Sequence, residues 1–482
     1  MTGNGAGNGA GEGTRGGLLI IGAGTAGLMA AIHAARAGAR VRLVDAADRV
    51  GGTLHLSAGH LSAAGSRLQA AKGIEDTPDA HYADVMRINR GSANPALVRL
   101  AVDHAVDTLH WLLDHGLEVL PDHPIFYKGH EPYTTPRTCW GPENGRSILK
   151  VLARELQAEI DRGRVELWLE TRLEALLTGE DGAVTGARLL RDGRHVDVDA
   201  AAVLLATGGY AASAEMFAEL NPGVPHHGGA WPQARGEGLA AARTLGAGIA
   251  HKGSYLPIFA CVEHPGTPGG YSAATVTNPL VRPPWELYVN DHGERFFAED
   301  QPSCDHREHA LANQPGMRFW AVYDEAIRAA APPFFLAPEL EARFGHSPDY
   351  VMADSLEALA AATGMNSAAL VATVSAYNAA QASGAPDPMG RTYRPAPVAQ
   401  GPFHAVRHHA WSILGFAGLT VDAALNVVRP DGMPIAGLYA AGEILGFGQT
   451  SGTAFCSGMS LTPALSFGRL LGAQLGRQVL KG

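Results

Sequence analysis

The 482-residue sequence has few cysteines, no long apolar run and no block of basic residues. Its four cysteines are widely separated and form no C-x-x-C pair, which argues against zinc, iron–sulfur and covalent haem sites. No stretch offers about 18 consecutive apolar residues, so we expect no transmembrane helix. The net charge of −10 makes nucleic acids and anionic membranes unfavourable partners. We therefore expect reduced thiols, no bound metal and a cytoplasmic location.

The length predicts two or more domains. Residues 1–16, rich in glycine and asparagine, are predicted to be a flexible tail rather than a signal peptide. From about residue 255 proline and glycine become frequent, and helical patterns follow at Ala310–Ala331 and Ser355–Gly384. We expect one domain built from residues 17–254 and 412–482, with a second domain, residues 255–411, inserted into it and covering it.

A glycine motif near the N-terminus predicts a dinucleotide site. Four apolar residues, Leu18–Ile21, have the pattern of a buried strand, and an alanine-rich helical run reaches Ala37. Between them lies G-x-G-x-x-G, in which the first glycine makes the tight turn, the second lets a diphosphate approach the backbone and the third lets the helix pack on the strand. The predicted binding residues here are Gly22, Ala23, Gly24, Thr25, Ala26 and Gly27.

The acid expected about 20 residues after this motif is Asp45, at the end of the strand Val41–Val44, where it can accept a hydrogen bond from a ribose. A second buried strand, residues 201–205, runs into the glycine-rich turn at Ala206, Thr207 and Gly208. Two such strand–turn features predict an α/β fold with a doubly wound, Rossmann-like sheet that contacts one ligand twice. The long polar loop 121–147 inside this domain is typical of a functional segment.

These features, together with Gly51-Gly52-Thr53, Ser57-Ala58-Gly59 and the late segment Gly437–Glu443, occur in order along the chain. In this respect the sequence resembles the flavoprotein family that contains fumarate reductase, succinate dehydrogenase, urocanate reductase and 3-ketosteroid dehydrogenase. The resemblance covers about residues 17–475. It implies FAD in a Rossmann-like domain with an inserted α+β capping domain, and hydride transfer between flavin N5 and a carbon beside a carbonyl- or carboxyl-activated carbon.

The resemblance also implies roles for individual residues. The first glycine motif would hold the diphosphate and Asp45 the adenosine ribose, while Glu443, after Gly442, would hold ribityl hydroxyls. Ser460 and Leu461 would begin the last helix, whose positive end favours anionic reduced flavin. Along the diphosphate and the flavin would lie Gly51, Gly52, Thr53, Ser57, Ala58 and Gly59, and near the adenosine half Thr207 and Gly208.

The substrate side departs from the fumarate-reducing members. The position of their carboxylate-binding arginine is occupied by Phe455, that of their catalytic arginine by Ser303, and that of a proton-relaying glutamate by Pro279. A dicarboxylate needs fixed cations, which phenylalanine cannot supply. We therefore expect closest kinship in character to the ketosteroid dehydrogenase branch, and a steroid-like or cyclic ketone that is desaturated, or reversibly reduced, next to its carbonyl.

Proton transfer in that branch depends on tyrosines, which this chain matches only in part. Tyr133 lies in the loop where the branch keeps an active-site tyrosine, whereas Arg307 and His306 occupy the stretch of the base tyrosine. We predict these three as catalytic candidates and leave the identity of the general base open. The predicted substrate-binding residues are Tyr133, Arg137, Phe455 and Gly458.

Several alternatives remain open from the sequence. An acid-specific reductase or dehydrogenase of the same fold could bind its substrate through Arg137, Arg282, Arg307, His408 and His409. A flavin-binding redox sensor or complex subunit without turnover is a further alternative, and an NAD-dependent dehydrogenase is the weakest. His55 follows the second glycine pair and could bond covalently to flavin, although we favour noncovalent FAD. The electron acceptor and the oligomeric state are not predicted.

Overall fold

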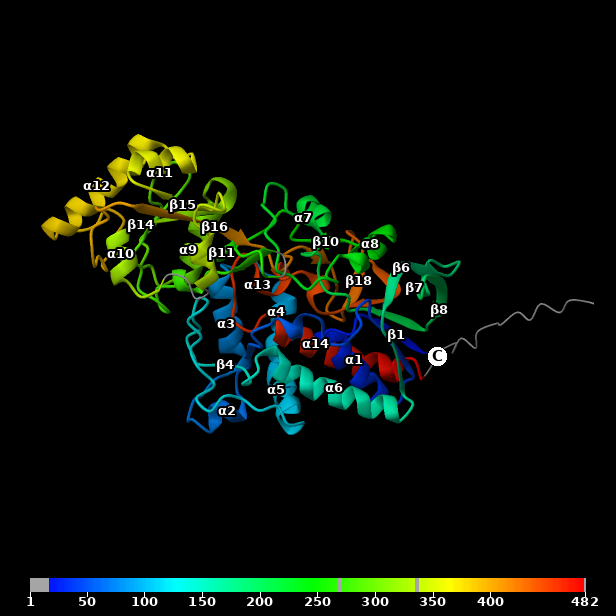
Figure 1. The fold of residues 1–482 in the computed structure, drawn as a ribbon. Helices are drawn as coiled ribbons and strands as arrows, with labels where there is room; N and C mark the ends of the chain where they lie inside the picture. The colour runs from blue at the N-terminus through cyan, green and yellow to red at the C-terminus, as the bar shows by residue number, and fades with distance from the viewer. Residues whose placement is uncertain (1–16, 268–269, 334–337, 481–482) are drawn as a thin grey trace, which may run out of the picture.

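The computed structural model describes residues 17–267, 270–333 and 338–480, so the predicted tail 1–16 lies outside the described residues. The chain forms two lobes (Figure 1). The larger lobe is built on a six-stranded sheet in the order β18-β19-β9-β1-β2-β5. All neighbours in this sheet are parallel except β18 and β19. The strands are β1 (Leu18–Ile21), β2 (Val41–Val44), β5 (Val165–Trp168), β9 (Ala202–Leu205), β18 (Asn426–Val428) and β19 (Pro434–Ala440).

The two central strands carry the predicted ligand-binding turns. Every residue of β1 and β9 is buried, as expected for parallel strands covered on both faces. Ile21 pairs with both Val44 and Leu205, so β1, β2 and β9 end at the same edge of the sheet. The chain leaves this edge at Gly22, Asp45 and Ala206. Ligands of open α/β sheets bind outside such carboxyl ends.

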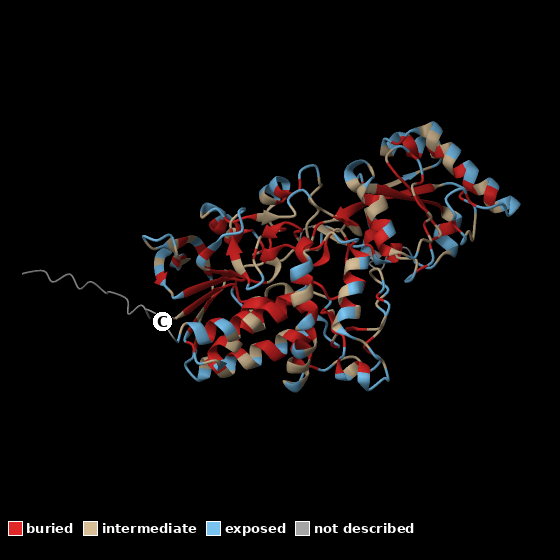
Figure 2. Ribbon diagram, turned by 180° about the vertical axis from the view of Figure 1, so that it is seen from behind, coloured by how far each residue is buried: buried red, intermediate tan, exposed pale blue. Residues whose placement is uncertain are grey.

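One face of this sheet is covered by helix α1 (Thr25–Arg36), which lies beside α14 (Leu461–Gln478) near the bottom of Figure 1. The two helices pack at backbone distance. A Cβ atom at Gly468, Gly472 or Gly476 would lie 2.4, 2.4 or 2.8 Å from the carbonyl oxygens of Ala26, Ala30 and Ala34, respectively. Both helices are red along most of their length in Figure 2 because they are buried. The order of the contacts also shows that the helices run parallel.

The rest of the larger lobe consists of short elements around this core. The chain turns at Asp192-Gly193, with positive φ at both residues, between two strands of a three-stranded antiparallel sheet. That sheet comprises β6 (Thr171–Thr178), β7 (Val184–Arg191) and β8 (Arg194–Asp199). The remaining elements are α2 (Arg67–Ala70), α3 (Pro78–Ile88), α4 (Pro95–Asp103), α5 (Ala105–Asp114), α6 (Gly145–Asp161), α7 (Ala214–Leu220), α8 (Glu237–Thr244), α13 (Gly448–Ser451), β3 (Leu61–Ser62), β4 (Thr138–Cys139), β10 (Ile249–Ala250) and β17 (Gly418–Leu419).

The smaller lobe, here called the cap, has its own antiparallel sheet and its own core around Trp320 and Tyr377. Its sheet order is β12-β11-β16-β14-β13, with β15 paired to β16. The strands are β11 (Ile258–Glu263), β12 (Tyr271–Ala273), β13 (Leu287–Val289), β14 (Arg318–Asp324), β15 (Tyr350–Ala353) and β16 (Phe403–Trp411). Its helices are α9 (Cys304–Ala312), α10 (Glu325–Ala330), α11 (Leu356–Thr363) and α12 (Ser367–Ser383).

The helix predicted over Ala310–Ala331 is wrong. Its middle forms strand β14, which lies between β13 and β16 in the cap sheet. The run Phe319–Tyr323 is rich in aromatic residues and is entirely buried, which favours a central strand over a helix. The predicted helical stretch Ser355–Gly384 is helical, but it is divided between α11 and α12 at Gly364, where φ is +79°.

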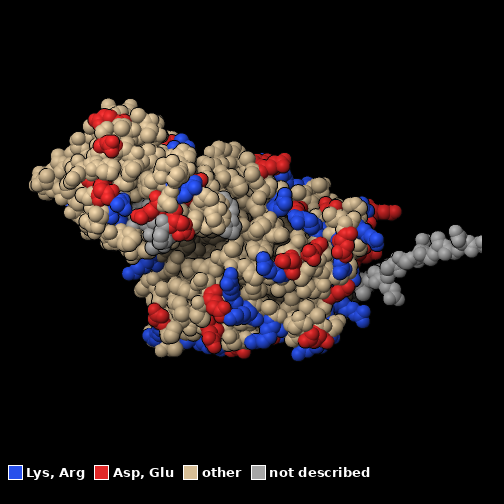
Figure 3. Space-filling view, in the orientation of Figure 1, with Lys and Arg blue, Asp and Glu red and all other residues tan. Residues whose placement is uncertain are grey.

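Charges of both signs are scattered over the face seen in Figure 3, and that face is hollowed where the cap meets the larger lobe. Within the described part of the chain, none of the helices combines the length and apolarity needed to cross a membrane. All four cysteines are free and buried.

The contact between α1 and α14 generates the first prediction. Replacing Gly472 with leucine should lower the free energy of unfolding by roughly 3 kcal/mol or more, because a side chain cannot fit against the carbonyl of Ala30. Leucine is the better helix former, so the loss must come from packing and not from helix propensity. Gln474→Leu, on the exposed side of the same helix, is the control. Chemical denaturation measures both variants, and equal stability would contradict backbone-distance packing.

Candidate functional site

A cleft lies at the carboxyl edge of the large sheet, with about 850 Å³ of space between its atoms when the open solvent at its mouth is included. Most of the residues predicted to bind the cofactor line it. These are Gly22, Gly24, Thr25, Ala26, Asp45, Gly52, Thr53, Ala206, Thr207, Gly208, Gly442, Glu443, Ser460 and Leu461. The other six predicted residues, Ala23, Gly27, Gly51, Ser57, Ala58 and Gly59, are outside this lining.

Each of the three positions in the first motif is glycine for a different structural reason. Gly22 has φ of +106°, and a Cβ there would lie 2.1 Å from the carbonyl oxygen of Ala206. At Gly27 a Cβ would lie 1.8 Å from the carbonyl oxygen of Gly22. A Cβ at Gly24 would have no atom of the described chain within 4 Å. The first and third glycines are therefore required by the fold, whereas the second leaves space in the cleft for a ligand.

Asp45 braces the turn that follows β1. Its Oδ2 accepts a hydrogen bond from the backbone nitrogen of Ala23 at 2.6 Å, and its Oδ1 accepts one from Ala47 at 2.8 Å. Burial raises the pKa of the carboxyl group, although these two backbone donors oppose the shift. A carboxylate oxygen can accept more than one hydrogen bond, so Asp45 can also accept from a ribose hydroxyl in the cleft.

Glu443 is the most unusual polar group of the cleft. Burial raises the pKa of its carboxyl group to about 7, opposed only by the backbone N–H of Gly415. Among the described residues, neither its Oε1 nor the Oγ1 of nearby Thr207 has a hydrogen-bond partner. Buried polar atoms without partners are costly. A ligand carrying several hydroxyl groups, such as the ribityl chain of FAD, would satisfy them, so the residues present fit this cofactor.

The cleft has further lining residues that the sequence motifs did not predict, namely Thr171, Leu173, Trp231, Gln233 and Glu237. Trp231 stacks on His55 with ring centroids 5.5 Å apart. The Nε2 of that histidine lies 3.0 Å from the carbonyl oxygen of Val50. An acid between two glycines, at residues 236–238, was the available sequence signal for this region.

An apolar cluster adjoins the other end of the cleft. Its buried members are Leu256, Phe416, Phe447 and Phe455, and Tyr255, Ile258 and Leu414 pack against them. We call this group the Phe455 cluster. Its members Leu414 and Phe447 line a second, small pocket, whose wall includes Gly442, Glu443 and Ser460 from the main cleft. The cluster therefore borders the end of the cleft where the last helix begins.

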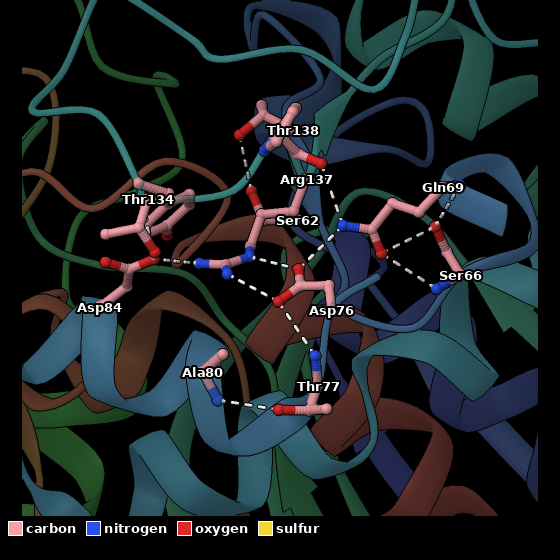
Figure 4. Close-up of polar contacts among 12 residues, drawn as sticks. Ser62, Ser66, Gln69, Asp76, Thr77, Ala80, Asp84, Thr134, Arg137 and Thr138 are labelled. Atoms are coloured by element: carbon pink, nitrogen blue, oxygen red, sulfur yellow. Dashed lines mark hydrogen bonds and ion pairs between the residues drawn. The ribbon is translucent and has the colours of Figure 1, made fainter. Parts of the chain in front are cut away.

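Two of the predicted substrate-binding residues, Tyr133 and Arg137, are buried among polar groups of the larger lobe. Figure 4 shows the polar contacts around Arg137. The three guanidinium nitrogens of Arg137 donate to Asp76 and Asp84 at 2.6–2.8 Å. The hydroxyl of Tyr133 donates to the carbonyl oxygen of Ser457. Burial raises the pKa of this phenol well above its usual value. Gly458 is a third predicted substrate-binding residue. It packs against Ser62, since a Cβ atom built at Gly458 would lie 2.5 Å from the Oγ of Ser62.

The structure does not bring the three predicted catalytic residues together. His306 is exposed and lines a different, open cleft with Arg90 and Asp305. Arg307, one residue later on α9, is buried, with Nη2 2.9 Å from the sulfur of Cys304 and its guanidinium carbon 5.4 Å from the centre of the Phe259 ring. Tyr133 is in the larger lobe. His306 and Arg307 are separated because adjacent positions on a helix face different directions.

The cations of the alternative acid-binding set are mostly neutralised. Arg282 makes a two-bond ion pair with Glu286, and His409 lies 2.7 Å from the carboxylate of Asp349. Arg307 instead contacts neutral groups, namely the sulfur of Cys304, the carbonyl of Thr277 and the side-chain oxygen of Asn278. Within the described residues there is no group of three or more histidine, cysteine, aspartate or glutamate side chains placed to hold a metal ion.

The fold and the cleft define a dinucleotide-binding flavoprotein. The family model for the FAD binding domain matches residues 17–461, and the chain belongs to this family. A probable fumarate reductase of Shewanella frigidimarina (strain NCIMB 400) is 30% identical over 472 residues, which cover 96% of this chain and 75% of that protein. The 4-oxocyclohexanecarboxylate 2-dehydrogenase of Sinomonas cyclohexanicum is 26% identical, and the match covers 96% of this chain and 93% of that protein.

Among solved structures, a 3-ketosteroid Δ1-dehydrogenase from Sterolibacterium denitrificans has the same fold, with a TM-score of 0.77 at 20% identity. The match covers 96% of this chain and 99% of that one. The predicted kinship, fold class and cofactor are therefore confirmed. The chain is an FAD-dependent oxidoreductase that reduces or dehydrogenates carbon–carbon bonds.

The geometry of the glycine turn makes a prediction about cofactor retention. Gly24→Val should give a folded, colourless protein, because the new side chain occupies only ligand space. The apo forms of the variant and the native protein should unfold at the same temperature, while absorbance near 450 nm, about where oxidised flavin absorbs, should be lost. Gly27→Val is the contrasting variant and should fail to fold. A yellow Gly24→Val protein would refute the assigned approach of the diphosphate.

The environment of Glu443 makes a prediction about pH. Its folded-state pKa is about 7 against an ordinary 4.5, so its contribution to apo-protein stability is present below pH 4.5 and is lost as the pH rises through 7. Glu443→Gln should remove this loss, which is at most about 3 kcal/mol, and should weaken FAD binding. Unfolding of the apo protein from pH 4 to 8 measures the effect, with Glu180→Gln at an exposed turn as control. Parallel pH profiles for Glu443→Gln and the native protein would contradict it.

Proposed function

We propose that this enzyme desaturates, or reversibly reduces, the carbon–carbon bond next to the carbonyl of a steroid-like or other cyclic ketone. The observation that carries the proposal is the Phe455 cluster, four buried apolar side chains of which Phe447 lines the small pocket that shares Gly442, Glu443 and Ser460 with the cleft. Bound FAD supplies the hydride acceptor or donor at N5. The aromatic and aliphatic walls would bind a ring through apolar contacts and exclude water from the reacting carbons.

Charge balance supports an uncharged substrate. A carboxylate loses strong hydration when it is buried, so it requires a cation that is free to bind it. Arg137 and Arg282 are each neutralised by carboxylates within the protein. The Sinomonas relative, by its name, dehydrogenates a cyclic ketone that also carries a carboxylate, so it supports the ring ketone but not the absence of charge.

We further propose that Arg307 holds the substrate oxygen that becomes an enolate when the α proton leaves. Its guanidinium group lies over Phe259, whose neighbour Ile258 packs against the Phe455 cluster. Its hydrogen-bond partners among the described residues are all neutral, although it also interacts electrostatically with the buried carboxyl group of Glu308. A fixed donor of this kind aimed at a developing oxyanion contributes about 10²–10³ in rate. Tyr133 is a poor candidate for the base, because its hydroxyl already donates to Ser457 and burial disfavours its anion.

The same observation favours a second candidate function. A buried arginine with neutral neighbours could instead bind one carboxylate of an unsaturated acid, as the name of the Shewanella relative suggests for that protein. Of the three arginines in the predicted acid-binding set, Arg137 and Arg282 pair with carboxylates and only Arg307 hydrogen-bonds neutral groups alone among the described residues, so a monoacid would be expected rather than a diacid.

Anaerobic spectroscopy distinguishes the two functions. The oxidised enzyme is mixed with a steroid ketone, cyclohexanone or succinate, and the photoreduced enzyme with the corresponding enones, fumarate or acrylate. We expect bleaching or recovery of the flavin band with the ketone and enone members only. Reaction with acids alone would replace the ketone proposal with the second function, and reaction with none of these compounds would remove both.

The role of Arg307 makes a separate prediction. Arg307→Ala should retain FAD but should slow flavin reduction by substrate more than tenfold, because the enolate loses its cation. Stopped-flow absorbance measures the rate at saturating substrate. Arg328→Ala, on the exposed face of α10, is the matched control and should react at the native rate. If Arg307→Ala also reacts at the native rate, Arg307 has no part in the chemistry.

A further inference from the structure

Arg137 lies at the centre of a buried charge cluster that joins distant parts of the larger lobe. Its Nε and Nη2 donate to the two carboxylate oxygens of Asp76, each at 2.8 Å, and its Nη1 donates to Asp84 at 2.6 Å. Figure 4 shows the guanidinium group between these carboxylates. Thr134 donates to Asp84 through both its backbone nitrogen and its hydroxyl. We call Asp76, Asp84, Thr134 and Arg137 the Arg137 cluster.

The charges of this cluster hold one another in their ionised forms. Burial alone would raise the pKa of Asp84, but hydrogen bonds from Arg87, Thr134 and Arg137 outweigh it and lower that pKa. Burial alone would lower the pKa of Arg137, and the two aspartates reverse this shift. The cluster is thus a rigid, charge-balanced anchor for the segment around residue 137.

The segment around residue 137 is hydrogen-bonded to the loop that precedes α14. The hydroxyl of Tyr133 donates to the carbonyl oxygen of Ser457, and the hydroxyl of Thr138 donates to the hydroxyl of Ser457 at 3.1 Å. Ser62, paired with Thr138 across β3 and β4, donates its backbone N–H to the hydroxyl of Thr462 at 3.0 Å. Three hydrogen bonds therefore connect the Arg137 segment and its strand partner to residues 457–462.

Residues 455–462 face the cofactor on one side and the Phe455 cluster on the other. Ser460 and Leu461 line the FAD cleft, while Phe455 is in the apolar cluster. Ser460 precedes α14 and, in the part of the chain that the structure describes, no side chain caps the free N–H groups of this helix. These groups carry partial positive charge and favour an anion placed before them.

We propose that Tyr133, Thr138 and Arg137 are positioning residues for the flavin: they fix residues 455–462 so that the positive end of α14 lies against the isoalloxazine and stabilises its reduced form. This role replaces the predicted direct contact of Tyr133 and Arg137 with substrate. The proposal depends on the FAD site and not on the identity of the substrate.

The test removes the hydrogen bonds to Ser457 without changing the charged residues of the Arg137 cluster. In the double variant Tyr133→Phe/Thr138→Val both donors to Ser457 are lost, while Arg137 keeps its aspartates. The midpoint potential of the bound flavin, measured by anaerobic dye titration, should fall. A tenfold loss in the binding of reduced relative to oxidised FAD corresponds to about 30 mV for this two-electron couple. The dissociation constant of oxidised FAD should change less than that of reduced FAD.

A matched control separates positioning from general stability. Thr108→Val removes a buried hydrogen bond of 2.9 Å between Thr108 and Ser466, which lies on α14 farther from the cleft. It should lower the melting temperature as much as the double variant does but leave the potential at the native value. A native potential in the double variant would overturn the proposal, as would a raised KM for substrate at an unchanged potential, which would return Tyr133 to the substrate site. Equal shifts in both variants would also overturn it, because stability alone would then set the potential.

Discussion

The packing of α1 against α14 is the contact on which the rest of the structure depends. Three glycines of α14, four residues apart, face three alanines of α1 with the same spacing, so the helices touch along their backbones. Positions four apart share one face of a helix, which makes the contact continuous over three turns. The helices run parallel, and their N-termini therefore point toward the same cleft. One positive end meets the predicted diphosphate position at Gly24, and the other meets the opposite end of the cleft at Ser460.

This arrangement divides the cleft by charge. The two helix ends supply partial positive charge where a flavin dinucleotide carries its negative groups, namely the diphosphate and the reduced ring. Asp45 and Glu443 supply acceptors where such a ligand carries hydroxyls. Beyond the ring, the Phe455 cluster provides neither charge nor hydrogen bonds from its side chains, except through the hydroxyl of Tyr255, which donates to Ser412. The protein thus places polar groups along the FAD cleft and apolar side chains beside it, at the proposed substrate site.

Much of the cofactor site could be predicted from the sequence because each part is local. The glycine motif, Asp45 and the turn before Glu443 each follow a strand within a few residues, and strand ends of a parallel sheet meet at one edge. The parts that could not be predicted depend on distant partners. Arg137 pairs with aspartates 61 and 53 residues away, so its burial has no local signature. Strand β14 has helices on both sides in sequence, and its aromatic run alone does not reveal that it lies buried between β13 and β16. The spacing of Gly468, Gly472 and Gly476 was a readable signal that the sequence analysis did not use.

The buried charges around Arg137 are hard to explain by stability alone. Removing three ionised side chains from water costs more than their attraction reliably returns, and apolar replacements of buried ion pairs are often neutral or stabilising. What such a cluster supplies is direction, because a guanidinium group binds two carboxylates only in a narrow range of geometries. Here Tyr133 and Thr138 transmit that fixed geometry to Ser457, in the loop between Phe455 and the start of α14. An apolar core at the same place would allow small shifts of that loop. Such shifts would change the distance between the helix end and the flavin ring, and the interaction of a helix end with a charge falls off within one turn.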